Sequence, residues 1–229
     1  MRVHVAFTPA EAESAPTAIV VDVLRATSTI AQALASGYRR VLCCGEVEDA
    51  RELRARLGEG VLAGERNAVA IPGFDLGNSP REFTEPLGET LILTTTNGTR
   101  AVLAAAASAE TVLVGSLLNL EAVAAAARGG EDVEVVCAGL QGRFTIDDAY
   151  CAGRIAELLG GRRSDAAEAA ARIARSFAGP LEGLSASENP EHALLGEDIA
   201  WCARESVLDV VPRLSRLEGA AAEIVSSTA

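Results

Sequence analysis

The 229-residue chain contains no lysine, and all 20 of its basic residues are arginine. A P-loop NTPase requires a lysine after its glycines, so that class of enzyme is excluded. Aromatic residues are only 3% of the chain, so a core must be built from the smaller apolar side chains within the 49% hydrophobic fraction. The net charge of −12 argues against non-specific binding to nucleic acid.

Histidine and cysteine are too scarce for several kinds of site. His4 and His192 are the only histidines and offer little material for a histidine-based mechanism. The five cysteines are an odd number without a CxxC pair, so we expect reduced thiols rather than a disulfide framework or a zinc site. The N-terminal residues lack the apolar region of a signal peptide, and no apolar run reaches the length of a membrane span. We therefore expect a cytoplasmic protein with no membrane partner.

Strand-like and helix-like segments alternate along the whole chain, without a linker or a shift in composition. This alternation predicts an α/β fold with a largely parallel sheet, in a single domain over residues 1–229. The expected strands are Arg2–Phe7, Ala18–Val23, Arg40–Cys44, Val61–Ala63, Thr90–Thr95, Thr111–Gly115, Val133–Cys137 and a last one at Val207–Val211. The expected helices are Ile30–Ser36, Glu46–Leu57, Ala101–Ala107, Leu120–Arg128, Asp147–Leu159, Asp165–Phe177 and Glu197–Ser206.

The apolar run Ala18–Val23 indicates a strand buried on both faces, and the chemistry is concentrated at its end. Asp22 closes the run, Arg25 follows it, and the hydroxyls of Thr27 and Ser28 precede the expected helix. Ligands of open α/β sheets bind beyond the carboxyl ends of the strands, where a helix N-terminus favours an anion such as phosphate. The alternative is that Thr27 or Ser28 only caps the helix and that Asp22 only pairs with Arg25.

Two further loops, Thr94–Arg100 and Cys137–Phe144, also connect an expected strand to an expected helix, and each contains an arginine. If the three strands are parallel and neighbouring, the three loops open on one edge of the sheet. The sequence therefore predicts one pocket with three arginines for a multiply charged anion. The candidates are Asp22, Arg25, Arg100 and Arg143 for catalysis, and Thr27, Ser28, Thr96, Asn97, Gly98 and Thr99 for binding the substrate.

Several carboxylates precede or begin expected elements near the same edge. Hard oxygen ligands beside a phosphate suggest Mg²⁺, which proteins hold with one or two carboxylates, water and the substrate. Asp22, Glu65 and Asp148 are the candidates for binding this ion or for activating water; Asp75, Asp147, Glu197 and Asp198 are the other acids of this kind. For the adjacent pairs, an equally good interpretation is a favourable interaction with the dipole of a helix N-terminus.

The longest irregular stretch, residues 68–88, is of the kind that is usually functional or mobile. We expect Asn78, Ser79 and Arg81 within it to bind the carboxylate or sulfonate end of a substrate.

Cys137 and Arg143 have the C-x5-R spacing by which a cysteine phosphatase binds phosphate. A helix N-terminus and an arginine would activate a thiolate there. A cysteine at the end of a strand is more often part of the core. A metal-independent phosphatase that uses Cys137 is therefore an alternative, and a non-catalytic protein that binds anionic metabolites is another.

Six segments spread in order over nearly the whole chain resemble the 2-phosphosulfolactate phosphatase family of coenzyme M biosynthesis. They are VVDVLRATSTI (20–30), GERNAVAIPGFDLGNSP (64–80), LTTTNGTRA (93–101), VCAGLQGRFTIDDAYCAG (136–153), EDIAWC (197–202) and LDVVP (208–212). The resemblance implies a three-layer α/β/α arrangement with a largely parallel or mixed sheet. It implies an Mg²⁺-dependent phosphatase that hydrolyses phosphate esters of 2-hydroxy carboxylic acids, with 2-phosphosulfolactate as the reference substrate.

The chain departs from the family pattern at residues 185–195, where the family tends to show a Ser–x–His–Gly-like segment. We therefore assign no role to His192. The expected partner is a small anionic phosphate ester, and a homodimer is left open.

Overall fold

The structure, a computed structural model, describes residues 1–227. The strands are β1 (Arg2–Ala6), β2 (Thr17–Val21), β3 (Arg40–Cys44), β4 (Val61–Arg66), β5 (Val69–Ala70), β6 (Thr90–Thr94), β7 (Thr111–Gly115), β8 (Asp132–Cys137), β9 (Arg162–Arg163), β10 (Val211–Glu218) and β11 (Ala221–Ser227). The α-helices are α1 (Ala26–Ser36), α2 (Val47–Leu57), α3 (Gly98–Ala106), α4 (Leu120–Ala127), α5 (Ile146–Leu159), α6 (Asp165–Arg175), α7 (Pro180–Ser185), α8 (His192–Leu195) and α9 (Asp198–Cys202). Short 3-10 turns, η1 and η2, occupy Pro9–Glu11 and Pro80–Glu82.

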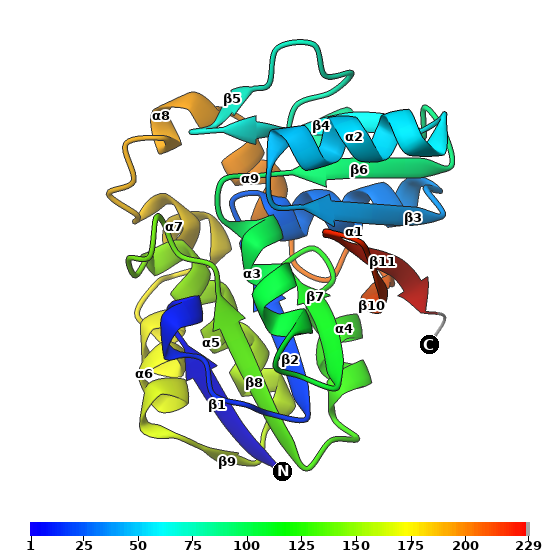
Figure 1. The fold of residues 1–229 in the computed structure, drawn as a ribbon. Helices are drawn as coiled ribbons and strands as arrows, with labels where there is room; N and C mark the ends of the chain where they lie inside the picture. Colours follow the sequence, from blue (N-terminus) through cyan, green and yellow to red (C-terminus); the bar gives the residue numbers. More distant parts are fainter. Residues whose placement is uncertain (228–229) are drawn as a thin grey trace.

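The strands form one mixed sheet in the order β5-β4-β6-β3-β11-β10-β7-β2-β8-β1-β9. The strands β4, β6 and β3 are parallel to one another, and so are β7, β2, β8, β1 and β9. The hairpin β10–β11 lies between these two groups and is antiparallel to both. In Figure 1 the strands of the two groups run in clearly different directions. The fold class predicted from the sequence is confirmed, with a mixed sheet.

The strand β2 is buried on both faces, as its apolar run predicts. Ile19 and Val21 pack in one core with α4, α5 and α6, whereas Ala18 and Val20 pack in a second core with α1 and α3. Successive residues of a strand face opposite sides, which is why one strand serves two cores. Helix α2 covers the outer face of the other strand group. The helices on both faces of the sheet are consistent with the three-layer α/β/α arrangement.

Helix α1 begins at Ala26, four residues before the expected start at Ile30. The hydroxyl of Thr27 donates to the backbone oxygen of Asp22 at 2.9 Å, and that of Ser28 donates to the oxygen of Val23 at 2.8 Å. These hydroxyls bond back to the preceding loop, so residues with weak helix propensity are held within the first turn. The expected strand Val61–Ala63 is likewise longer and runs to Arg66, which places Glu65 on β4.

The C-terminal part differs most from the prediction. The expected helix Glu197–Ser206 is only Asp198–Cys202, and the expected strand Val207–Val211 is wrong because β10 begins at Val211. The hairpin β10–β11 was not predicted at all. Its strands contain charged residues, and the buried Glu223 binds Arg40 and Arg216 at 3.1 and 2.9 Å. Because these strands contain charged residues paired with one another, their sequences lack the apolar run that is typical of a central strand.

No helix between residues 1 and 227 combines the length and the apolar character that crossing a membrane requires. The five cysteines are all free and buried, in agreement with the prediction that they form no disulfide framework.

Candidate functional site

Loops from the carboxyl ends of strands in both groups meet around one small cavity. Asp22 comes from the end of β2, Glu65 from β4, Asn97 from the loop after β6 and Gly139 from the loop after β8. The three loops therefore converge as the sequence predicts. The premise that their strands are parallel neighbours holds only for β2 and β8, since β6 lies in the other strand group and α3, which follows it, contacts β2 and β7.

This cavity, hereafter the acidic cavity, is lined by five carboxylates and one arginine. They are Asp22, Glu65, Asp147, Asp148, Glu191 and Arg25. Burial, with repulsion from Glu65 and Asp147, raises the pKa of Asp22 to about 7. Burial and repulsion from Asp147 and Asp22 raise the pKa of Asp148 well above its usual range. The free volume of the cavity is about 30 Å³.

Asp148, in the first turn of α5, joins two of the converging loops. Its Oδ1 accepts a hydrogen bond from the Val23 N–H at 2.9 Å, and its Oδ2 accepts one from the Gly139 N–H at 3.0 Å. The side chain is 4% exposed. A carboxylate with both oxygens held in this way has a fixed position, and each oxygen keeps a second lone pair for a ligand.

Asp22 presents one oxygen that accepts no hydrogen bond from the described residues. Its Oδ1 accepts a hydrogen bond from the Ala26 N–H at 3.2 Å, whereas its Oδ2 accepts none from any residue that the structure describes. Helix α3 begins directly beside it. A Cβ placed on Gly98 would lie 2.5 Å from Asp22 Oδ2 and 2.4 Å from the Cβ of Ala26. The glycine is therefore required for this close approach of α3 to Asp22.

Glu65 and Asn78 complete the carboxylate side of the cavity. The two oxygens of Glu65 accept hydrogen bonds from the N–H groups of Thr96 and Ala68 at 2.7 and 2.8 Å, and Thr96 adds its hydroxyl at 3.0 Å. Asn78 is 4% exposed, and its Oδ1 is buried without a hydrogen-bond partner among residues 1–227. A buried oxygen without a donor is costly, so it indicates a missing partner at this point.

Arg25 lines the acidic cavity, but an internal carboxylate already neutralises it. Its Nη1 donates to Asp198 at 2.6 Å, and both side chains are almost fully buried. The hydroxyl of Ser79 donates to the other oxygen of Asp198, also at 2.6 Å. The peptide bond between Leu24 and Arg25 is cis.

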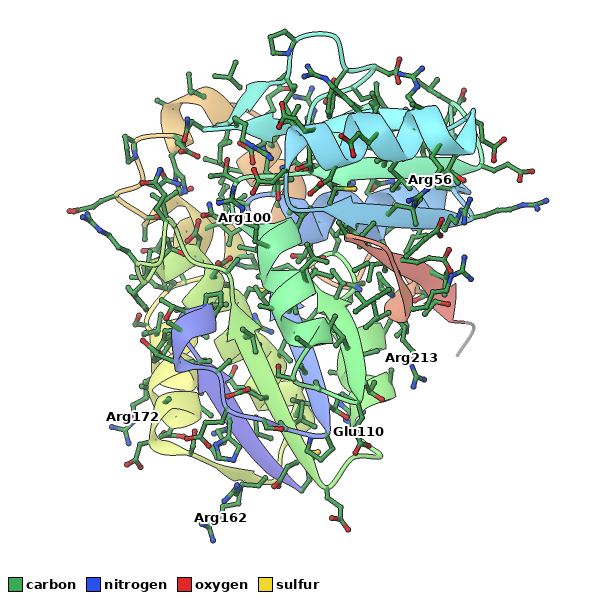
Figure 2. All side chains as sticks on the ribbon, in the orientation of Figure 1. Arg56, Arg100, Glu110, Arg162, Arg172 and Arg213 are labelled. Atoms are coloured by element: carbon green, nitrogen blue, oxygen red, sulfur yellow. The ribbon has the colours of Figure 1, made fainter. Side chains whose placement is uncertain are left out.

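The other two arginines do not line the acidic cavity, so the predicted pocket with three arginines is wrong. Arg100 is half exposed and pairs with Glu46 at 2.8 Å (Figure 2). It is the third residue of α3, and the first turn of the helix directs it away from Asp22. Arg143 lines a neighbouring, larger groove instead.

Seven of the expected substrate-binding residues also lie outside the lining of the acidic cavity, namely Thr27, Ser28, Ser79, Arg81, Thr96, Gly98 and Thr99. Thr27 and Ser28 bond back to the loop before α1, and Thr99 exchanges hydrogen bonds with Thr95. Ser79 binds Asp198, and Arg81 pairs with Glu197. The hydroxyl and guanidinium groups of these residues instead hold the loops in place. Among the expected binding residues, Asn78 and Asn97 do line the cavity, and Gly98 touches Asp22.

Cys137 ends β8 and packs in the core, with 1% of its surface exposed. It lines neither the acidic cavity nor the neighbouring groove. Burial, together with repulsion from Asp148, raises the pKa of the Cys137 thiol well above its ordinary value, which disfavours the thiolate needed for attack. The geometry therefore gives no support to the cysteine alternative.

The sequence did not identify residues 189–195, the segment before α9, as part of the site. Asn189, Glu191 and Leu195 line the acidic cavity, and His192 Nε2 lies 3.2 Å from Asp147 Oδ2. This is the segment in which the chain departs from the family pattern, so no motif pointed to it. Asp147 and Asp148, which lie beside this segment, are among the acids that the sequence suggests, but a favourable interaction with the helix dipole explains them equally well.

The donor set fits a hard divalent cation held mainly by water and substrate. Among residues 1–227, no three His, Cys, Asp or Glu side chains are grouped closely enough to hold a metal ion by themselves. Mg²⁺ usually takes only one or two protein carboxylates. The available oxygens include Asp22 Oδ2, the second lone pairs of Asp148, the unpartnered Oδ1 of Asn78 and the carboxylate of Glu191.

Known proteins similar to this chain share one description. Residues 5–216 match the family model of 2-phosphosulpholactate phosphatase. The chain is 37% identical over 229 residues to a probable 2-phosphosulfolactate phosphatase of Carboxydothermus hydrogenoformans, covering 96% of this chain and 95% of the relative. The relatives of the same name from Thermus thermophilus and Deinococcus radiodurans are 38% and 40% identical, covering 93% and 86% of this chain and 94% and 87% of their own lengths.

Proposed function

Since the chain belongs to the 2-phosphosulfolactate phosphatase family and is a phosphoric monoester hydrolase, we propose that it hydrolyses 2-phosphosulfolactate, or a closely similar phosphate ester of a 2-hydroxy carboxylic acid, with the help of Mg²⁺. The products are the 2-hydroxy acid and inorganic phosphate. The substrate part of this proposal rests on the names of the relatives. A role in coenzyme M biosynthesis stays a prediction from the sequence.

The charge of the acidic cavity is the observation that carries the Mg²⁺ part of the proposal. Five carboxylates surround a single arginine, and Asp198 already neutralises that arginine. A phosphate ester entering such a cavity alone would be repelled, whereas a divalent cation offsets the carboxylates and attracts the phosphoryl oxygens. Burial first, and then repulsion from neighbouring carboxylates, raises the pKa values of Asp22 and Asp148.

In this proposal, different residues of the chain bind the ion, position the loops and line the wall of the cavity. Asp22 Oδ2, Asp148 and Asn78 Oδ1 would hold the ion, which when bound supplies a Lewis acid for the phosphoryl oxygens. Arg25, fixed by Asp198, places a guanidinium at the wall of the cavity without adding net charge. Glu65 positions the loops after β4 and β6 through Thr96 and Ala68. The free volume of about 30 Å³ admits an ion or a water, but not a whole ester.

The test separates metal binding from turnover. Metal-depleted protein should show no phosphatase activity on 2-phosphosulfolactate and should regain it with Mg²⁺. Mg²⁺ alone should also raise the Tm, because a ligand that binds only the folded state stabilises it, by about 2.7 kcal/mol at 100 times its Kd.

Asp22→Asn should abolish both the activity and the Mg²⁺-dependent rise in Tm. The matched control is Asp209→Asn, since Asp209 is exposed and lines neither cavity. Full activity of the metal-depleted enzyme would refute the Mg²⁺ requirement. Failure to hydrolyse any ester of a 2-hydroxy acid in the presence of Mg²⁺ would refute the substrate assignment.

A further inference from the structure

A groove of about 540 Å³ adjoins the acidic cavity. Leu140, Thr145 and Asn189 line both spaces, so the two share a wall. Ligand pockets for small molecules usually have 300–1,000 Å³, and the acidic cavity offers only about 30 Å³. A substrate whose phosphoryl group reaches the acidic cavity therefore has its remaining atoms in the groove.

The guanidinium of Arg143, which lines this groove, is available to bind a ligand. In the part of the chain that the structure describes, its side chain has no ion pair or hydrogen bond with another residue. The other described arginine of this kind is Arg162, in β9 beside the start of β1, at the opposite end of the strands from the acidic cavity (Figure 2). The groove contains one carboxylate, Glu188, so its charge differs from that of the acidic cavity.

The backbone of Arg143 is held in a rigid turn. Its N–H donates to the oxygen of Leu140 at 3.0 Å, and its oxygen accepts from the Leu140 N–H at 2.9 Å. The two residues between them, Gln141 and Gly142, have φ of 51° and 77°, the left-handed values that a tight two-residue turn requires. The N–H of Gln141 donates to Asn97 Oδ1 at 3.0 Å, which ties this turn to the loop after β6.

The same loop connects the groove to the acidic cavity. Gly139 donates its N–H to Asp148, and a Cβ on Gly139 would lie 2.3 Å from the oxygen of Arg143. The positions of Asp148 and of the Arg143 backbone are therefore fixed relative to each other. Such a loop suits a ligand with two anionic ends, one for the ion-binding carboxylates and one for the guanidinium.

We propose that the groove is the subsite for the carboxylate of the substrate, and that Arg143 binds this carboxylate. The proposal rests on the phosphatase function proposed above and assigns its specificity to one residue. It replaces Ser79 and Arg81, which the sequence suggested for this role and which bind Asp198 and Glu197 instead. The guanidinium, a planar fork, suits a carboxylate well.

The first experiment compares 2-phospholactate with isopropyl phosphate, in which a methyl group replaces the carboxylate. Arg143→Gln should raise KM for 2-phospholactate about 10- to 100-fold with little change in kcat, because a hydrogen-bonded charge that binds ground state and transition state alike is lost. The preference for 2-phospholactate over isopropyl phosphate should fall by a similar factor. Arg143→Lys should restore part of this preference.

The matched control is Arg162→Gln, which removes an unpaired arginine far from the groove and should leave both constants unchanged. An equal loss on both esters would place Arg143 at the phosphoryl group and overturn the proposal. No loss on either ester would overturn it as well.

A second measurement needs no turnover. Calorimetry with 3-sulfolactate should give a Kd for Arg143→Gln at least 10-fold above that of the wild-type and Arg162→Gln proteins. Equal affinities, or no binding to the wild-type protein, would refute the subsite. If no phosphate ester of a 2-hydroxy acid is hydrolysed, 2-phosphosulfolactate included, but this difference in Kd is found, the phosphatase function fails and the anion subsite stands.

Discussion

The loops after β2 and β6 look alike in sequence and differ in what they do with their arginine. In each, a buried strand is followed by an arginine near the start of a helix. Arg25 is the residue directly before α1 and is buried against Asp198. Arg100 is the third residue of α3 and lies at the surface against Glu46. Each helical residue turns the side-chain direction by about 100°, so a shift of a few positions moves an arginine from the cavity to the solvent.

The two ion pairs also differ in what they contribute to stability. The pair between Arg25 and Asp198 is removed from water, and the hydroxyl of Ser79 satisfies a further lone pair. The pair between Arg100 and Glu46 has both side chains more than half exposed, so solvent screens it. The predictions below test this difference, from the largest expected effect to the smallest.

Arg25→Gln should destabilise the protein most. It leaves the buried Asp198 with only the more distant guanidinium of Arg81, 4.0 Å away, and breaking a buried pair in this way costs about 3–5 kcal/mol. Urea unfolding in metal-free buffer measures the loss. The double variant Arg25→Gln/Asp198→Asn should lose less than the sum of the two single variants, because it leaves no unpaired charge. Additive losses would show that the pair does not act as a unit.

Gly98→Ala should lower both activity and stability. The new methyl group would lie 2.5 Å from Asp22 Oδ2, so α3 or Asp22 must move. Overpacking of this kind costs about 1–3 kcal/mol, and displacement of a functional carboxylate by about 1 Å lowers kcat/KM roughly 100-fold. Gly129→Ala is the control, since a Cβ there meets no atom within 4 Å. Equal kcat/KM for the two variants would contradict the assignment of Asp22 to the site.

Cys137→Ser should lower kcat/KM by only a small factor. The thiol is buried and its pKa is raised, so the wild-type enzyme should also resist iodoacetamide in its folded state at pH 7 to 8. Activity after incubation with the reagent provides the measurement. Removal of a covalent nucleophile lowers rates by orders of magnitude, so a loss of that size, or a trapped phosphocysteine, would restore the cysteine alternative.

Arg100→Gln should have the smallest effect. Exposed ion pairs contribute about 0–1 kcal/mol, and Arg100 lines neither cavity, so unfolding free energy and kcat/KM should stay close to the wild-type values. Measured beside Arg25→Gln under the same conditions, this variant defines the contrast between the two loops. A loss of activity as large as that of Gly98→Ala would return Arg100 to the phosphate site.

The sequence was sufficient for most of the parallel strands, for the alternation and for the loops that form the site. The apolar runs specify β2, β6 and β8 to within two residues, and the carboxyl ends of the parallel neighbours β2 and β8 lie side by side. Sequence position does not tell whether an arginine is free or already paired within the protein. Arg25 and Arg143 could be separated only after Asp198 and the turn at Gln141 were placed in three dimensions.

The segment containing Asn189 and Glu191 was beyond the reach of sequence reasoning for another reason. It lies between α7 and α8 with no apolar periodicity, and its place at the cavity depends on packing against distant elements. The hairpin β10–β11 was not predicted for a related reason. Ion pairs across its strands replace the apolar alternation by which a central strand is usually identified.

The central position of that hairpin has a consequence for how the chain folds during synthesis. Residues 211–227 separate two groups of strands that are complete in sequence by residue 163. Until β11 has left the ribosome, β3 and β7 each present an open edge, and contacts so distant in sequence form slowly. A chain shortened before residue 211 would keep both edges exposed. Such a chain would be prone to pair with other chains, so the hairpin closes both edges in the completed protein as well as joining its two strand groups.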